Sequence, residues 1–338
     1  MRADLVDARF TLPDKLARVS WAYVGAIVLL GAVGYAMLYS AAGGSHEPWA
    51  WRHAVRLTTG VVVMLFVALV DPRLWFRLAY LAYGGAFAAL VGVEIMGSLA
   101  KGAQRWIDLG FVQLQPSELM KVALVLALAR YFHGATLPQV GRPFFLVPPV
   151  LMIAAPALLV LKQPDLGTTV MLVASGAVVL FLAGVRWWKF AAVGALAASA
   201  LPVIWGALHD YQRERVLTFL DPSQDPLGAG YHIIQSKIAL GSGGMWGKGF
   251  LEGSQAQLSF LPEKHTDFVF TMLAEEQGLV GALAVLALYF VVFAMGLLFA
   301  LRTRSHFGRL VAAGASVTFF LYVVINVAMV TGLIPVVG

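Results

Sequence analysis

The chain has 338 residues, of which 60% are hydrophobic and 12% are charged, with a formal net charge of +6. Soluble domains average about 45–50% apolar and about 25% charged residues, so an ordinary soluble protein is excluded and a polytopic membrane protein is indicated. The chain has no cysteine, which excludes disulfides and thiol chemistry, and in a membrane protein the positive charge points to topology and anionic lipids, with no nucleic-acid partner expected.

Nine apolar runs are candidates for membrane-spanning helices, each of which needs about 20 apolar residues. The continuous apolar blocks exclude a β-barrel, whose strands would alternate in hydrophobicity over about 10 residues. The sequence therefore predicts an all-α, polytopic integral membrane protein that forms a single domain over residues 1–338. The expected spans are 19–41, 53–70, 74–97, 118–133, 144–161, 167–184, 190–207, 267–301 and 309–332.

The distribution of Lys and Arg over the connecting segments predicts the orientation. With the N-terminus in the cytoplasm, the inside segments carry 13 of these residues and the short outside segments carry 6. Because basic residues accumulate on the cytoplasmic side, we expect the N-terminus inside and the long polar segment 208–266 outside. The first apolar run is longer than the core of a signal peptide, about 7–15 residues, so we expect it to be retained as a span.

Polar residues on the predicted outer side first gather in the segment 98–121. Ser117 can cap the following helix, and Glu118 suits its first turn, where an acid complements the helix dipole. Alternatively, Glu118 and Lys121 share one helix face and form a charged pair whose lysine binds phosphate. The spacing alone supports both interpretations equally.

Asp165 lies in a second short polar stretch, between two spans that are joined by almost no loop. Its side chain can cap the sixth span. It can also join Glu118 and Lys121 in a polar cavity that opens outward. Both interpretations stay open at this point.

The outer segment 208–266 is long for a connection between spans, and such loops are usually functional. Its part 231–240 is half apolar and is expected to form an amphipathic helix on the membrane surface. The glycine-rich part 241–249 is not a P-loop, because Lys248 is followed by glycine rather than by Ser or Thr. Its backbone amides can hold an anion, and a flexible hinge is an equal alternative.

Lys264, His265 and Asp267 crowd the point where the chain leaves the outer segment and enters the eighth span. Charges at such a boundary are solvated on one side only, so they are candidates for catalysis. Asp267 is the best candidate for a base, although it can also be a simple first-turn acid. On a helix Glu275 and Glu276 point in different directions, so both cannot serve one cavity with Asp267, and one is expected to pair with a neighbouring helix.

Five motifs occur in order along nearly the whole chain: Gly102-Ala-Gln-Arg-Trp106-Ile, Gln115-Pro-Ser-Glu118, Gln163-Pro-Asp-Leu-Gly-Thr168, Gly241-Ser-Gly-Gly-Met-Trp-Gly-Lys-Gly249 and Leu261-Pro-Glu-Lys-His-Thr-Asp-Phe268. With them the chain resembles the SEDS family (shape, elongation, division and sporulation), and its RodA-type branch more than its FtsW-type branch. The resemblance implies ten spans with both ends in the cytoplasm. Because nine are found, we expect the tenth span to be missing from a truncated chain.

The resemblance also implies an activity and a location. It implies a peptidoglycan glycosyltransferase of the bacterial inner membrane, which polymerises lipid II into glycan strands during cell elongation and rod-shape maintenance. The partner would be a class B penicillin-binding protein, which crosslinks the product. Asp267 corresponds to the essential catalytic residue. The residues expected to bind substrate, by the resemblance or by their place beside Asp267, are Arg105, Trp106, Glu118, Lys121, Asp165, Lys264 and His265.

The chemistry of such a transfer accounts for these residue types. The acceptor hydroxyl must lose a proton as it attacks the anomeric carbon, and the carboxylate of Asp267 can take it. The leaving undecaprenyl pyrophosphate needs positive charge, either from Arg105, Lys121 and Lys264 or from a divalent cation such as Mg²⁺ or Mn²⁺. Binding of this cation is the rival role for Asp267.

Two other classes of function stay open. A lipid II flippase would fit the many spans and the intramembrane acids, but it predicts a polar path that reaches the cytoplasmic side. A non-catalytic scaffold that activates a penicillin-binding protein predicts that substitution of Asp267 leaves the function of the complex intact.

Overall fold

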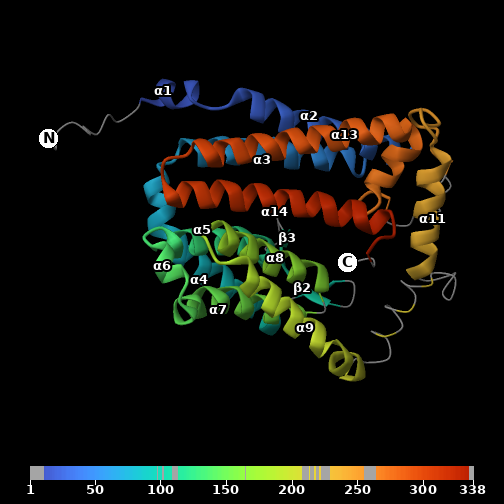
Figure 1. Cartoon of the computed structure of the whole chain (residues 1–338). Helices are drawn as coiled ribbons and strands as arrows, with labels where there is room; N and C mark the ends of the chain where they lie inside the picture. Colours follow the sequence, from blue (N-terminus) through green and yellow to red (C-terminus); the bar gives the residue numbers. More distant parts are fainter. Residues whose placement is uncertain are drawn as a thin grey trace.

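The computed structural model describes residues 11–334, apart from 97, 101–102, 109–112, 164, 208–212, 214–216, 218–220, 222–228 and 255–263. The described chain is mainly a bundle of helices with a small sheet at one end (Figure 1). The helices are α1 (Leu12–Ala17), α2 (Trp21–Ala41), α3 (Ala50–Leu69), α4 (Pro72–Met96), α5 (Pro116–Phe132), α6 (Leu137–Val140), α7 (Pro143–Lys162), α8 (Leu166–Leu182), α9 (Trp187–Ala207), α11 (Ala229–Ser242), α13 (Val269–Arg302) and α14 (His306–Val330). The strands are β1 (Ser98–Ala100), β2 (Ala103–Asp108) and β3 (Gln113–Leu114).

A helix lies in each of the nine predicted spans. Among the described residues, six helices are long and apolar enough to cross a bilayer by their length and composition, namely α2, α3, α4, α7, α13 and α14. Helices α5 and α8 have 17 residues each, which is somewhat short for an upright span. The chain is therefore a multi-pass helical membrane protein, and the count of nine spans stays a prediction.

The prediction of an all-α chain was wrong for the connection between α4 and α5. This connection forms a three-stranded antiparallel sheet in the order β1-β2-β3. The strands have 3, 6 and 2 residues, too few to show an alternating hydrophobic pattern. The sheet lies beside the N-terminal end of α5, and its strand β2 carries Arg105 and Trp106.

Helix α14 lies inside the bundle, where it packs against α13, α5 and α8. At Gly314 a Cβ atom would lie 2.8 Å from a Val125 methyl and 2.9 Å from a Val179 methyl, so only glycine permits this approach. The main buried cluster joins α4, α5, α7 and α8 with the first turns of α14. A second cluster joins the end of α2 to the start of α13.

Helix α13 is interrupted at Gly278, which has φ 68° and ψ −168°. The predicted span 267–301 is therefore two helical segments, a short one before the break and a long one after it (Figure 1). A Cβ atom at Gly278 would lie 2.3 Å from the backbone nitrogen of Gly247, and a positive φ also favours glycine. The break leaves carbonyl and amide groups without partners inside the helix.

The glycine-rich segment 243–249 binds the backbone on both sides of this break. Its hydrogen bonds run from Lys248 N to Glu275 O (3.0 Å), from Gly249 N to Glu276 O (3.0 Å), from Leu279 N to Gly244 O (2.9 Å) and from Val280 N to Met245 O (3.2 Å). Broken helices in membranes need such replacement bonds. The amides of Lys248 and Gly249 are therefore occupied, so the anion-binding interpretation fails for them, and the hinge interpretation stays a prediction.

The sheet, α11 and the start of α13 lie at one end of the bundle, whereas α6 lies at the opposite end (Figure 1). The end with the sheet and α11 is the predicted outer side. Helix α11 contains the predicted amphipathic segment and packs against α13 and α14. Its Ser236 hydroxyl donates to the carbonyl of Val330 at 2.7 Å and lies 2.9 Å from the Thr271 hydroxyl. Membrane-surface binding of α11 stays a prediction.

Candidate active site

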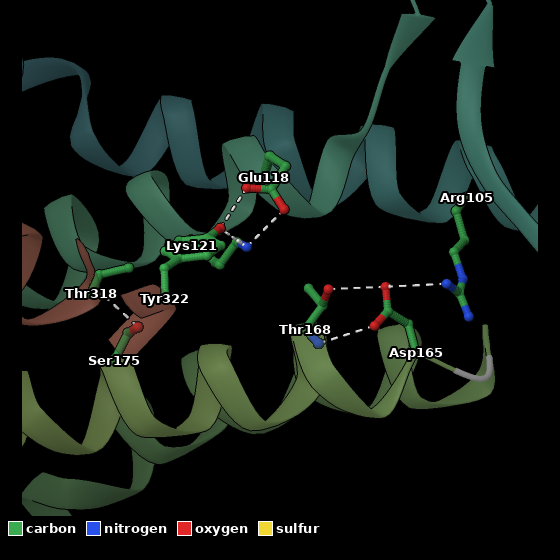
Figure 2. Close-up of polar contacts among 8 residues, drawn as sticks. All are labelled: Arg105, Glu118, Lys121, Asp165, Thr168, Ser175, Thr318 and Tyr322. Carbon is green, nitrogen blue, oxygen red and sulfur yellow. Dashed lines mark hydrogen bonds and ion pairs between the residues drawn. The ribbon is translucent and has the colours of Figure 1, made fainter. Parts of the chain in front are cut away.

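The predicted pair of Glu118 and Lys121 is present on α5, and a tyrosine from α14 completes it (Figure 2). The ammonium of Lys121 donates to Glu118 Oε1 at 2.7 Å and to the Tyr322 hydroxyl. Tyr322 in turn donates to Glu118 Oε2 at 2.6 Å. Lys121 is only 2% exposed, while Glu118 and Tyr322 are exposed. The buried cation therefore lies behind its two exposed partners.

Helix α5 begins differently from the prediction. Gln115 is the N-cap and Pro116 occupies the first turn, so Ser117 lies inside the helix and does not cap it. Pro suits this position because its fixed φ is helical and the missing N–H would have no partner there. Glu118 does lie in the first turn, as expected. Both predictions for Glu118, the charged pair and the position in the first turn, are therefore correct.

Asp165 performs the predicted capping role, and the polar cavity shared with Glu118 and Lys121 stays a prediction. Its carboxylate caps α8, accepting from the Thr168 backbone N–H at 3.0 Å and from the Thr168 hydroxyl at 2.9 Å. It also forms an ion pair with Arg105 from β2, at 3.9 Å between Nη1 and Oδ2. The Arg105 Nε–H donates to the Gln163 carbonyl at 3.2 Å, which holds the guanidinium beside the start of α8.

The two ion pairs belong to one polar region between the ends of α5 and α8 (Figure 2). The structure thus brings Arg105, Glu118, Lys121 and Asp165 together, as the sequence predicted. Trp106 follows Arg105 on β2 and is partly buried.

One face of α14 connects this region to Asp267. Thr318, Tyr322 and Asn326 are four residues apart and therefore share a helix face. Thr318 donates to the Ser175 hydroxyl of α8 at 3.0 Å (Figure 2). At the other end of the row, the Asn326 side-chain amide donates to the Asp267 backbone carbonyl at 3.0 Å. The α14 row therefore ties together α8, α5 and the segment before α13.

Asp267 lies outside α13, in a turn before its N-cap Phe268. The interpretation as a simple first-turn acid is therefore wrong, because the first turn of α13 contains no acid. The Asp267 residue is partly buried. It is thus placed at the boundary between the outer loop and the bundle, as expected for a catalytic acid or base.

Lys264, three residues before Asp267, borders a cavity of about 340 Å³ at the end of α2. Lys264 lines this cavity with Glu47 and Trp49. The His265 ring stacks on the Trp49 indole, with centroids 4.5 Å apart and planes at 10°. Burial lowers the pKa of the Lys264 ammonium from its ordinary value. The cavity thus combines an aromatic wall, a cation and the carboxylate of Glu47.

A second cavity of about 390 Å³ lies between α2, α13 and α14 and is mainly apolar. Tyr322 and Asn326 line it, together with Val269 at the start of α13. The polar region, Asp267 and an apolar cavity therefore adjoin one another. This arrangement suits a substrate with a polar head group and a hydrocarbon tail.

Glu275 and Glu276 are both buried, and each has its own partner away from Asp267. Lys248 donates to Glu275 Oε1 at 2.6 Å, and Ser40 of α2 donates to Glu276. The bond from Ser40 of α2 confirms the prediction that one of the two acids pairs with a neighbouring helix.

The sequence reasoning missed Tyr322, Asn326 and Lys248. For the first two, a signal existed in the four-residue spacing of polar side chains inside an apolar helix.

In the described part of the chain, no group of three or more His, Cys, Asp or Glu side chains is placed to hold a metal ion. The described residues alone therefore do not fit a metal site made only of protein ligands.

Comparison with known proteins shows the family of this chain. The family described as cell cycle protein, with the members FtsW, RodA and SpoVE, matches residues 16–338. The chain belongs to this family. It is 45% identical over 314 residues to the peptidoglycan glycosyltransferase MrdB of Escherichia coli K12, covering 92% of this chain and 84% of that protein. It is 34% identical over 323 residues to stage V sporulation protein E of Bacillus subtilis, covering 92% and 87%.

Two solved structures share the fold of this family member. One chain of a peptidoglycan synthase complex, studied for its coordination of polymerization and crosslinking, has a TM-score of 0.82 and 32% identity, covering 95% of this chain and 90% of that chain. The rod shape determining protein RodA of Thermus thermophilus has a TM-score of 0.70 and 28% identity, covering 95% and 88%. The resemblance inferred from the motifs is confirmed.

Proposed function

We propose that the chain is a peptidoglycan glycosyltransferase that polymerises lipid II into glycan strands, with Asp267 as the general base. The relatives named above support the activity. The observation that carries the proposal is the convergence of the predicted polar residues with Asp267 at one end of the bundle, through the bond between Asn326 and the Asp267 carbonyl.

The proposed reaction is a single inverting displacement. The acceptor hydroxyl attacks the anomeric carbon of the donor sugar, forming a new carbon–oxygen bond. The bond from that carbon to the undecaprenyl pyrophosphate breaks, and the pyrophosphate leaves with the electron pair. The Asp267 carboxylate takes the hydroxyl proton. Both lipid tails stay in the bilayer, which suits a site at the membrane boundary and an adjoining apolar cavity of about 390 Å³.

Positive side chains stabilise the charge of the leaving pyrophosphate. Lys121 is buried and Arg105 is tied to the α8 start, so both cations are held before substrate arrives. Preorganised charges of this kind favour the transition state because they need no reorientation during the reaction. Lys264, beside the Trp49 cavity, is the cation next to Asp267 in the chain. Trp106 and His265 are assigned to sugar contacts.

A divalent cation is the alternative source of positive charge. Mg²⁺ is usually held by one or two carboxylates together with substrate phosphates, so a cation here would arrive with the pyrophosphate and not with the protein alone. No step is assigned to it. A class B penicillin-binding protein, which crosslinks the strands, is the proposed partner. The inner membrane and a cytoplasmic N-terminus are the proposed setting.

The test is polymerisation of lipid II by the purified chain together with its penicillin-binding partner. Wild type and Asp267→Asn are compared with magnesium and with a chelator, and glycan strands are resolved on gels. We expect strands from wild type and a loss of about 10²–10⁴-fold in the variant, the range for a general base. If Asp267→Asn polymerises lipid II as well as wild type does, Asp267 is not the general base. If the chelator stops polymerisation by wild type, the metal-binding role of Asp267 is favoured.

Two outcomes favour the other classes of function. Movement of lipid II head groups across vesicles that contain the chain, without any polymer, supports a flippase. Activation of the partner by both forms, again without polymer, supports a scaffold. Neither class has a specific contact in the described structure in its favour.

A further inference from the structure

Lys248 and Glu275 form an ion pair away from the substrate-facing residues. The Lys248 ammonium lies 2.6 Å from Glu275 Oε1 and also donates to the Ser254 hydroxyl at 2.8 Å. Ser254 is 3.2 Å from the same carboxylate oxygen. The Glu275 side chain is fully buried, whereas that of Lys248 is 30% exposed. The pair thus joins the glycine-rich segment to the interior of the bundle.

The same two residues are joined a second time through their backbones. Lys248 N–H donates to the Glu275 carbonyl at 3.0 Å, directly before the break at Gly278. Gly253 packs against both buried acids, since a Cβ atom there would lie 3.2 Å from Glu275 Oε2 and 3.3 Å from Glu276 Oε1. Two carboxylates therefore meet in one small buried space, and Lys248 supplies a positive charge in direct contact with one of them.

Charge balance makes Lys248 important for the short segment of α13. A buried carboxylate without a cation is costly, and loss of one partner of a buried ion pair usually destabilises the structure strongly. Without Lys248, Glu275 would move towards water or bind a proton. Either change would release the end of the short segment from segment 243–249.

The short segment transmits this effect to Asp267. It begins at Val269, two residues after Asp267, and ends at the break. Its nine residues span about 13 Å, because an α-helix rises about 1.5 Å per residue. Its start is held by Asn326 on the Asp267 carbonyl and by Ser236 beside Thr271. The segment is thus a short rigid arm with Asp267 at one end and the Lys248 pair at the other.

We propose that Lys248 is a positioning residue for Asp267, which acts through its ion pair with buried Glu275 and the short first segment of α13. This role deepens the proposed glycosyltransferase function and rests on it. Lys248 is not assigned any contact with substrate. A misplacement of about 1 Å can cost about 10²-fold in rate, so an anchor at this distance can control catalysis.

The experiment compares Lys248→Met, Lys248→Arg, Glu275→Gln and the double variant Lys248→Met/Glu275→Gln. Lys237→Met is the matched control, because Lys237 is an exposed lysine on nearby α11. Two readouts are taken on the full chain with its partner: kcat and KM for lipid II, and hydrogen exchange of the peptides that cover 264–277. Thermal unfolding of each variant is recorded alongside.

We expect Lys248→Met to lower kcat at least tenfold, with KM changed less than twofold, and to raise exchange in 264–277 selectively. Lys248→Arg should keep kcat within about threefold of wild type, since it retains the charge. The double variant should recover part of the loss, because the carboxylate of Glu275 is removed together with the cation that paired with it. Lys237→Met should behave like wild type.

Unchanged kcat and unchanged exchange in Lys248→Met overturn the proposal. So does a rise of exchange over the whole chain with equal loss in the double variant, since that result means a purely structural role. If wild type itself makes no polymer, the proposed glycosyltransferase function fails. The exchange data then decide the positioning role separately, because selective loosening of 264–277 does not need substrate.

Discussion

The side-chain amide of Asn326 on α14 donates to the backbone carbonyl of Asp267 at 3.0 Å. One turn earlier on the same helix face, Tyr322 bonds Glu118 and Lys121 of α5. A single helix therefore carries the contacts of both the proposed base and the charged pair proposed to bind substrate. Their relative position depends on α14 more than on the loops that contain them.

The Asn326 bond can be tested by Asn326→Leu, which nearly keeps the volume and removes the donor. We expect a loss of stability of about 1 kcal/mol, the usual net value of one hydrogen bond. Polymerisation should fall further, by about tenfold, because the Asp267 carbonyl loses its anchor. The rates and the thermal unfolding of both forms are measured together. Val324→Leu, at a residue of α14 that is 42% exposed, should match wild type in both, and an equal result for Asn326→Leu would contradict the anchor.

Tyr322→Phe tests the contact between α14 and α5. The hydroxyl accepts from Lys121 and donates to Glu118 at 2.6 Å, so its removal leaves only the direct ion pair of 2.7 Å. We expect the free energy of unfolding to fall by about 1–3 kcal/mol, since hydrogen bonds to charged groups are stronger than those between neutral groups.

A double-mutant cycle with Glu118→Gln should show coupling of roughly 0.5–3 kcal/mol for residues in contact. The control is Tyr289→Phe, because Tyr289 lines the same apolar cavity from α13 and has no hydrogen bond through its hydroxyl among the described residues. Additive losses in the cycle would mean that Tyr322 and Glu118 act independently.

The pH dependence of substrate binding should report on Lys264. Burial lowers the pKa of its ammonium, so this positive charge disappears at a lower pH than that of an ordinary lysine. If Lys264 binds the pyrophosphate, KM for lipid II should rise as pH increases through the lowered pKa. Lys264→Arg should shift this rise to higher pH, because arginine stays protonated.

The same shift has a consequence for stability. Between the lowered pKa and the ordinary value, the unfolded chain binds more protons than the folded chain at this residue, so its contribution to stability increases with pH. Lys237→Arg serves as the control for both curves. An identical pH profile of KM in wild type and Lys264→Arg would remove Lys264 from the phosphate site.

Gly278→Ala tests the break in α13. The backbone there has φ 68°, and a Cβ atom would lie 2.3 Å from Gly247 N and 2.6 Å from the Met245 carbonyl oxygen. We expect a loss of about 2 kcal/mol or more in the free energy of unfolding, from backbone strain and from displacement of the glycine-rich segment. Gly85→Ala on α4 is the control, because a Cβ atom there has no neighbour within 4 Å. It should leave the melting temperature unchanged or raise it, and similar behaviour of Gly278→Ala would mean that the break is not required.

Some features of this protein could be predicted from the sequence because they depend on local physics. The apolar runs of α2 and α13 require a membrane, and Glu118 and Lys121 meet because they are three residues apart on one helix. Asp165 precedes an apolar run directly, so its capping role follows from the chain alone. The order of the motifs around Arg105 and Asp267 was enough to identify the family.

Other features depend on contacts between residues far apart in the chain, which no local pattern contains. Tyr322 is 204 residues from the Glu118 that it bonds, and Asn326 is 59 residues from Asp267. The break at Gly278 is stable only because segment 243–249 supplies the hydrogen bonds that an unbroken helix would make internally. Helical periodicity in the sequence therefore determined which helix faces are polar and which are apolar. The packing of α14, α5 and the glycine-rich segment decided which of these polar groups meet. The reason is that buried polar groups must find partners wherever the fold provides them.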